Sequence, residues 1–207
     1  MAGRLRRLSL LTRDVPVLVV TAFGLAVTYI SLVSLFVVGL VLTDPGGWTG
    51  LGIALGYALL LLGLAALALF RPLTAAVGVS LLSLGPLGLA AWTLLDHTAM
   101  RGWEDGVGPV GLALTMVAAS GAAVIGLQRP AAGGAFLLLV TVVPAALAVG
   151  GAGAGWASEL MIGFITAPLA VAGGIFVVAA YEAAHPGPRL PKTLRVRRAA
   201  RTLTPAA

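Results

Sequence analysis

The residues that could do chemistry are few, and the densest group of them lies in one short polar segment between two long apolar stretches. Its members are Asp96, His97, Arg101, Trp103, Glu104 and Asp105. Carboxylates beside an imidazole can coordinate a divalent cation, but the spacing here matches no recognised ligand motif. We expect a solvated loop that is the best candidate for an external recognition surface. Partner contact and metal binding are the alternatives, and we assign no metal.

The rest of the chain lacks the groups on which most active sites depend. It has no cysteine, which removes thiolate chemistry and cysteine-ligated metals. Its two histidines, His97 and His185, fall on opposite sides of the membrane in the topology that the charges favour, so they cannot hold a haem between them. The serines of the apolar stretches have no His or Lys in register to activate them, and no H-E-x-x-H or G-x-x-x-x-G-K-[ST] motif occurs. We therefore expect no catalytic residue, no cofactor and no enzyme activity.

Long apolar segments make up most of the chain, and they must position any side chains that act in its function. Of the 207 residues, 59% are hydrophobic and 10% are charged, whereas soluble domains carry about 25% charged residues. A bilayer core about 30 Å thick needs about 20 apolar residues per helix. The stretches that reach this length are 15–43, 49–70, 72–95, 107–128, 130–150 and 159–181. We expect an all-α, polytopic membrane protein in which six transmembrane helices form a compact bundle over residues 15–181, between tails 1–14 and 182–207.

The basic residues predict the orientation of the six spans. Every Lys and Arg except Arg101 falls in the two tails or in the short connections at residues 71 and 129. Basic residues concentrate on the cytoplasmic side, so both termini are expected there. The four tryptophans fall in or beside the opposite connections, where indole rings anchor in the headgroup region; a ligand-stacking platform is the alternative. The Ala-, Gly-, Leu-, Val- and Arg-rich composition resembles small integral membrane proteins of high-GC bacteria, so we expect a bacterial cytoplasmic membrane.

The same basic residues indicate that the protein contacts lipid headgroups at the membrane surface. The formal net charge is +6, and the basic residues border apolar segments, as expected for membrane-surface electrostatics. We expect contact with anionic lipid headgroups and no binding of nucleic acid. The arginines assigned to headgroup contact are Arg71, Arg129, Arg195, Arg197 and Arg198.

A two-helix unit recurs in the middle of the chain. An Arg-Pro pair at 71–72 is followed by Pro86, and the same pair at 129–130 is followed by Pro144, at a constant offset of 58 residues. The second and third spans are therefore expected to recur as the fourth and fifth, in a parallel repeat unlike the inverted repeats of many transporters. A proline inside a helix removes a backbone hydrogen bond and bends the helix. We assign Pro86, Pro144 and Pro168 as helix hinges, with fixed kinks as the alternative.

Small residues recur at helix-packing spacings along three of the spans. They are Thr21, Gly24, Thr28 and Ser31 in the first span, Gly52 and Gly56 in the second, and Gly163, Ala167, Ala170 and Gly174 in the sixth. In lipid, small residues let helix backbones approach closely. We expect these stripes to pack inside the bundle; a contact surface for another membrane subunit is the alternative.

Three functions are compatible with these features. No ionisable residue lies in the middle of a span, where proton relays and ion-coupled transporters place them. The first hypothesis is therefore an accessory, scaffold or signalling subunit with a membrane-protein partner or a second copy of itself. A transporter or channel for a small neutral or apolar solute is the alternative. The third hypothesis, an enzyme that acts on lipid, would rely on the polar loop Asp96–Asp105.

Overall fold

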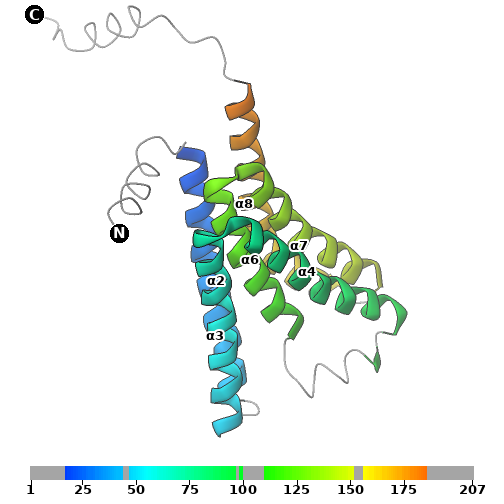
Figure 1. Ribbon diagram of the computed structural model, residues 1–207. Helices are drawn as coiled ribbons and strands as arrows, with labels where there is room; N and C mark the ends of the chain where they lie inside the picture. Colours follow the sequence, from blue (N-terminus) through cyan, green and yellow to red (C-terminus); the bar gives the residue numbers. More distant parts are fainter. Residues whose placement is uncertain (1–16, 44–46, 97, 100–109, 152–155, 186–207) are drawn as a thin grey trace, which may run out of the picture.

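The computed structural model describes residues 17–43, 47–96, 98–99, 110–151 and 156–185, with backbone alone at 148–151 and 156–165 (Figure 1). This part of the chain is all-helical, as predicted. Its long helices are α2 (Val17–Thr43), α3 (Gly47–Phe70), α4 (Pro72–Leu95), α6 (Val110–Gln128), α7 (Pro130–Gly151) and α8 (Trp156–Ala184). Each of the six is long and apolar enough to cross a bilayer, so the predicted class, a multi-pass helical membrane protein, is confirmed.

The helix boundaries follow the predicted spans closely, with one correction at the C-terminal end. The last helix, expected to end at residue 181, continues to Ala184, so residues 182–184 belong to α8 and not to the tail. Glu182 and the two alanines after it are good helix formers. Pro186 then disfavours helical backbone at the residue before it. Of the two predicted tails, residues 1–14 and 186–207 lie outside the described residues.

Helix α6 is the centre of the bundle. In its apolar window 67% of the residues are buried, against 22–28% in the other five helices. It packs against α2, α3, α4 and α7, and the ring of Phe176 from α8 lies against Gly126. Most residues between 118 and 126 are Ala, Gly or Ser. Because small side chains cover its whole circumference, neighbours can approach α6 from every side.

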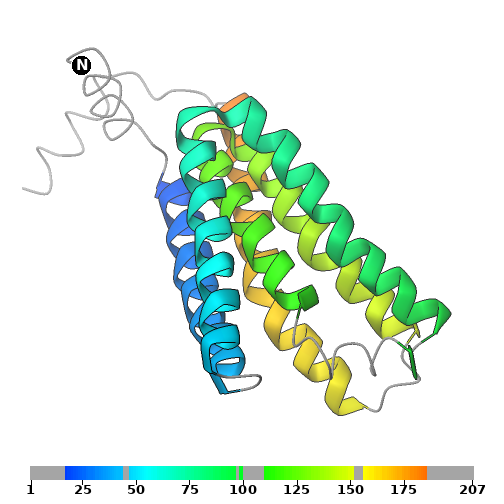
Figure 2. The ribbon, with the colours of Figure 1, turned by 60° about the horizontal axis from the view of Figure 1, so that its bottom comes forward.

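Two ends of the bundle can be distinguished by their connections. Helix α2 begins, and α8 ends, at the same end as the turns at residues 71 and 129 (Figure 1). We call this the arginine end, because Arg71 and Arg129 lie there. Toward the opposite end, the α4 and α7 pair diverges from the α2 and α3 pair, with α6 between them (Figure 2). Helix α8 closes the back by packing against α7 and α2.

The two helical hairpins share their turn geometry, which supports the predicted repeat. In the first turn, Arg71 N–H donates to Leu67 O at 2.7 Å, and Ala75 N–H donates to Arg71 O at 2.9 Å. The second turn has the same two bonds 58 residues later, at 2.7 and 3.0 Å, with Arg129 in the place of Arg71. Equivalent helices also touch, since α3 packs on α6 and α4 packs on α7. The hairpins therefore lie side by side in parallel orientation.

Glycine makes the closest helix contacts, but not at the predicted positions. A Cβ atom on Gly134 of α7 would lie 2.7 Å from the carbonyl oxygen of Gly173 in α8. A Cβ atom on Gly173 would in turn lie 3.2 Å from the oxygen of Gly134. The backbones of α7 and α8 therefore meet directly, with no room for a side chain between them.

Candidate functional site

The polar loop singled out in the sequence lies almost wholly outside the described residues. His97, Arg101, Trp103, Glu104 and Asp105 are not described. Asp96 directly follows α4; its backbone N–H donates to Trp92 O at 2.8 Å, and its Oδ1 accepts the N–H of Ala99 at 3.0 Å. The carboxylate therefore holds the start of the next turn. Within the described ranges, no group of three His, Cys, Asp or Glu side chains could hold a metal ion.

The three prolines assigned as hinges lie inside helices that continue past them. Pro86 is buried in α4, whereas Pro144 in α7 and Pro168 in α8 are half-buried. A hydroxyl residue precedes the first two by three positions: Ser83 Oγ donates to Val79 O, and Thr141 Oγ1 donates to Leu137 O, both at 2.6 Å. Both hydroxyls are buried, and they occupy equivalent places in the repeat. A Ser or Thr that bonds back to its own helix also favours a bend.

The small-residue stripe of α2 points away from the bundle, which corrects the expectation that it packs inside. Thr21, Gly24, Thr28 and Ser31 are all exposed, and a Cβ on Gly24 would have nothing within 4 Å. The buried positions of α2 lie on another side of the helix. They are Val19, Ala22, Ala26, Ile30, Val33, Val37 and Val41. We call the four exposed residues the small-residue face.

The stripe of α3 is also turned outward, and that of α8 is at most partly packed. Gly52 and Gly56 are exposed, with nothing within 4 Å of an added Cβ. In α8, Ala167 is exposed, Ala170 is half-buried, and a Cβ on Gly174 would again meet open space. The surroundings of Gly163 are not described. Large side chains at other positions, such as Tyr57 and Leu64 of α3, form the buried contacts instead.

The buried polar side chains among the described residues of the spans are satisfied by hydrogen bonds. Ser83, Thr115, Ser120 and Thr141 are the buried polar residues, and each donates to a backbone carbonyl of its own helix. In the part of the chain that the structure describes, no buried side-chain N or O atom lacks a partner. These hydroxyls therefore support the packing and do not form a polar path through it.

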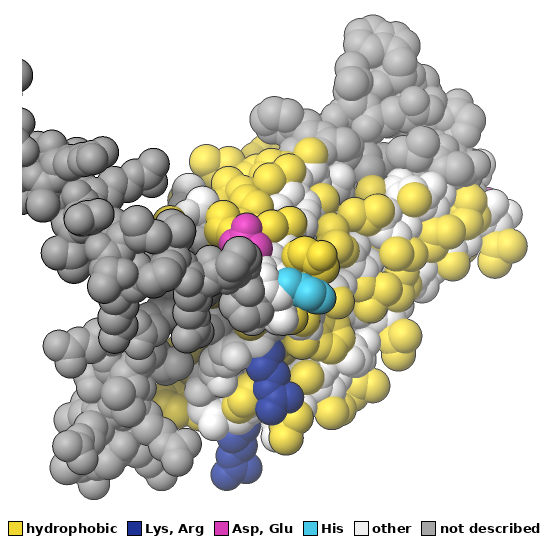
Figure 3. Space-filling view, turned by 90° about the horizontal axis from the view of Figure 1, so that it is seen from above, with side chains coloured by type: hydrophobic (Ala, Val, Ile, Leu, Met, Phe, Trp, Pro, Cys, Tyr) yellow, Lys and Arg dark blue, Asp and Glu magenta, His cyan; other side chains and the backbone are white. Residues whose placement is uncertain are grey.

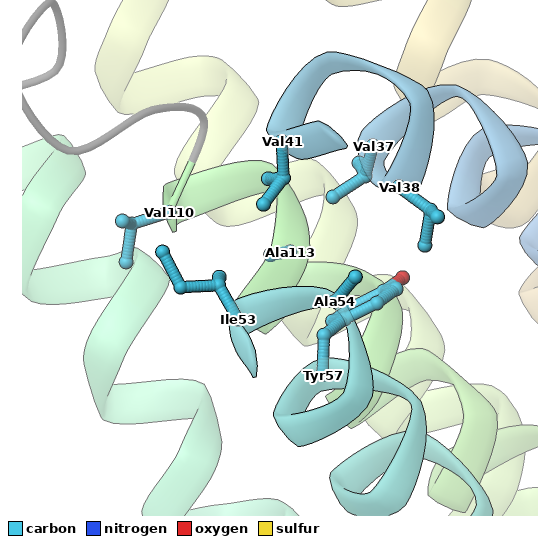
Figure 4. A pocket seen from close by; sticks show the side chains of 8 residues that line it. All are labelled: Val37, Val38, Val41, Ile53, Ala54, Tyr57, Val110 and Ala113. Atoms are coloured by element: carbon cyan, nitrogen blue, oxygen red, sulfur yellow. The ribbon is translucent and has the colours of Figure 1, made fainter. Parts of the chain in front are cut away.

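One small cavity opens between α2, α3 and α6, on the side away from the arginine end (Figure 4). Its volume is about 50 Å³. Its walls are Val37, Val38, Val41, Ile53, Ala54, Tyr57, Val110 and Ala113. The Tyr57 ring lies on one wall, and its hydroxyl reaches α2, where it is 2.6 Å from Ser34 Oγ. A water molecule needs about 10–15 Å³ of such space, so this cavity holds a few atoms and no larger solute.

The arginine end brings together two of the predicted headgroup contacts. Arg71 and Arg129 are both exposed, and the basic side chains gather at one edge of this end (Figure 3). The side-chain amide of Gln128 links the two turns, because Nε2 donates to Ala68 O at 3.0 Å and to Leu69 O at 3.4 Å. The other arginines with this assignment, Arg195, Arg197 and Arg198, lie outside the described residues.

Sequence reasoning missed Gln128 and Tyr57, each of which joins α3 to another helix. Gln128 had a usable signal, because it is a long polar side chain at the end of a mostly apolar span, next to Arg129. Tyr57 had none, since an aromatic residue among leucines carries no indication of its partner. Comparisons of the chain with family models, curated proteins and solved structures give no match.

Proposed function

We propose that the protein is a non-catalytic accessory or scaffold subunit of a bacterial cytoplasmic membrane, with both termini cytoplasmic. It binds a transmembrane helix of a partner through the small-residue face. The observation that carries this proposal is that Thr21, Gly24, Thr28 and Ser31 are exposed together on α2. A signalling role would use the same contact.

The chemistry of this face favours a helix over lipid as its neighbour. Many other exposed positions on α2 carry large side chains, such as Leu32, Leu35 and Phe36, which lipid tails solvate well. At Gly24 the backbone itself is accessible, and hydroxyls flank it on the same face. Close backbone approach and interhelical hydrogen bonds are what drive helices together in a bilayer.

The alternative function, a channel or carrier for a small neutral or apolar solute, has less support. Such a protein needs a path wide enough for its solute. Among the described residues the core is filled mostly by Val, Ala and Leu side chains, and the cavity beside Tyr57 has a volume of about 50 Å³. The packing of α6 therefore favours the subunit role.

Disulfide crosslinking tests the proposal without background, because the chain has no cysteine of its own. Ser31→Cys places a thiol on the small-residue face, and Ser80→Cys, at an exposed serine of α4, is the matched control. We expect oxidation in native membranes to crosslink the Ser31→Cys variant to a partner cysteine, or through a dithiol-reactive linker to a partner residue. The Ser80→Cys variant is expected to stay uncrosslinked.

The mass of the product identifies the partner. A product of twice the chain mass shows that a second copy occupies the face, and any other discrete mass shows a different subunit. The proposal is wrong if Ser31→Cys yields no discrete product while the wild-type protein purifies in mild detergent as a monomer without a partner.

A further inference from the structure

Each of the two turns at the arginine end exposes an arginine guanidinium in the same backbone setting. Arg71 and Arg129 each end one helix and begin the next, with identical backbone hydrogen bonds on both sides. In each turn a proline follows directly, which fixes the start of the next helix. The repeat therefore duplicates an exposed guanidinium along with the hairpin.

Packing brings the two duplicated groups onto one surface. Helices α4 and α7, which begin immediately after the two arginines, pack against each other. The amide of Gln128, next to Arg129, donates to the carbonyls of Ala68 and Leu69, close before Arg71. This bridge holds the two turns side by side, so Arg71 and Arg129 lie on the same surface of the bundle (Figure 3).

The backbone adds further positive character to this surface. The N-terminus of α4 has no side-chain cap, and the first intrahelical donor there is Ala75 N–H. The N–H groups of Leu73 and Thr74 therefore have no acceptor within the helix. In the first turn of α7 the first intrahelical donor is Gly133 N–H, so the N–H groups of Ala131 and Ala132 likewise have no acceptor within the helix. Two helix N-termini beside two arginines favour an anion with several oxygen atoms.

The surroundings of Arg71 are apolar, which distinguishes a lipid from a free anion. Phe70 is 77% exposed and Leu73 is 67% exposed, on either side of the turn. An amphipathic ligand can satisfy both parts of this surface, since its headgroup binds the arginines while its acyl chains cover the apolar side chains. Glu182, at the end of α8, is the one carboxylate at this end in the described residues.

We propose that Arg71 and Arg129 form a binding site for one anionic phospholipid that carries two phosphate groups. Each guanidinium binds one phosphate in bidentate geometry, and the N-termini of α4 and α7 donate to the remaining oxygens. The site is separate from the small-residue face, so it does not depend on the proposed partner.

Native mass spectrometry of the delipidated full chain tests this site with three probes: diphosphatidylglycerol, phosphatidylglycerol and phosphatidylcholine. We expect diphosphatidylglycerol to bind with a stoichiometry of one and at least about 10-fold more tightly than phosphatidylglycerol, because two charge-assisted contacts replace one. Phosphatidylcholine is expected not to bind. Equal affinity for the two anionic lipids would contradict the two-phosphate site.

Charge-matched variants separate this site from general attraction to a basic protein. Arg71→Gln/Arg129→Gln is expected to weaken binding of diphosphatidylglycerol at least about 10-fold, since each arginine contact is charge-assisted. Arg195→Gln/Arg197→Gln removes the same charge from the tail and is expected to change it less than about 3-fold. An equal loss in the tail variant, or no loss in the turn variant, would overturn the proposal.

Two further measurements test whether misfolding explains the loss of binding and whether a free anion could be the ligand. Arg71→Lys/Arg129→Lys keeps the charge but loses bidentate geometry, so it is expected to bind with intermediate affinity and to elute as the wild type does. Diphosphatidylglycerol is expected to raise the unfolding temperature, whereas inorganic phosphate alone is not. If phosphate stabilises the protein as much as the lipid does, the assignment to a lipid is wrong. Crosslinking through Ser31→Cys is expected to be unchanged in the turn variant.

Discussion

Individual polar side chains attach α3 to its neighbours. Most hydroxyls in the spans bond back to their own helix, but Tyr57 meets Ser34 of α2 at 2.6 Å, and Gln128 of α6 reaches Ala68 O at 3.0 Å. Ser120 of α6 also approaches Leu61 O, at 3.3 Å. Only 22% of the apolar window of α3 is buried, the smallest share among the six helices. Polar contacts therefore supplement a modest packing surface on this helix.

The bond between Tyr57 and Ser34 is expected to stabilise the protein measurably. Removing the hydroxyl by Tyr57→Phe leaves the ring in place and is expected to lower the free energy of unfolding by about 0.6 kcal/mol, the average for interhelical hydrogen bonds in a membrane protein, and by no more than about 1.7 kcal/mol. Equilibrium unfolding in mixed micelles measures it. A double-mutant cycle with Ser34→Ala isolates the pair, and Ser80→Ala, at an exposed serine bonded to its own helix, is the control. Strict additivity of the two single variants would show that the contact contributes nothing.

At the scale of helices, length and position could be predicted from the sequence, but the buried face could not. Apolar runs about 20 residues long, with an Arg-Pro pair at two of the connections between them, marked every helix within a few residues of its observed bounds. Each helix is apolar on all sides, so no alternation of polar and apolar residues distinguishes the core side from the lipid side. Small residues gave the wrong side on α2: Gly24 faces outward, whereas Gly121 of α6 lies among Val79 and Leu64. The sequence feature that corresponds to burial is the presence of small residues around the whole circumference of a helix, as in α6.

The contact between α7 and α8 is expected to tolerate little added volume. Gly134→Ala would place a methyl group 2.7 Å from a backbone oxygen that cannot move without shifting α8. We expect the free energy of unfolding to fall by about 1–3 kcal/mol, as for other overpacked sites.

Gly52→Ala is the matched control for this substitution, because open space surrounds its added methyl group. It is expected to leave stability unchanged or to raise it by up to about 1 kcal/mol through helix propensity. Thermal unfolding of both variants in the same detergent compares them. Equal stability of the two would show that the helices adjust freely and that close approach is unimportant.

For the molecule as a whole, the positions of the basic residues agree with the directions in which the helices run. The two turns with Arg71 and Arg129 lie at the end where α2 begins and α8 ends, as the distribution of basic residues predicted. The lipid site that we propose at this end could be predicted in part, since the arginines stood out in the sequence but the proximity of their two turns required the contact of Gln128 with α3. The polar loop after Asp96 stays a prediction, because most of it lies outside the described residues.

Labelling with a membrane-impermeant maleimide is expected to place both tails on the cytoplasmic side. Ser9→Cys and Thr202→Cys are expected to react in inverted membrane vesicles and to be protected in intact spheroplasts, because basic residues are retained in the cytoplasm. Thr98→Cys, just beyond α4, is expected to show the reverse pattern. Labelling of the two tails from different sides would contradict six crossings.

The central place of α6 has a consequence for biosynthesis. Helices α2, α3 and α4 all pack on α6, yet all three leave the ribosome before it does. A nascent chain that has inserted only these three lacks the surface against which they are to assemble. Most of the helix packing in the core thus forms only once the fourth span has entered the bilayer, although α3 can already contact α2 and α4. A chain truncated shortly before residue 110 therefore leaves three helices without the helix on which each of them packs.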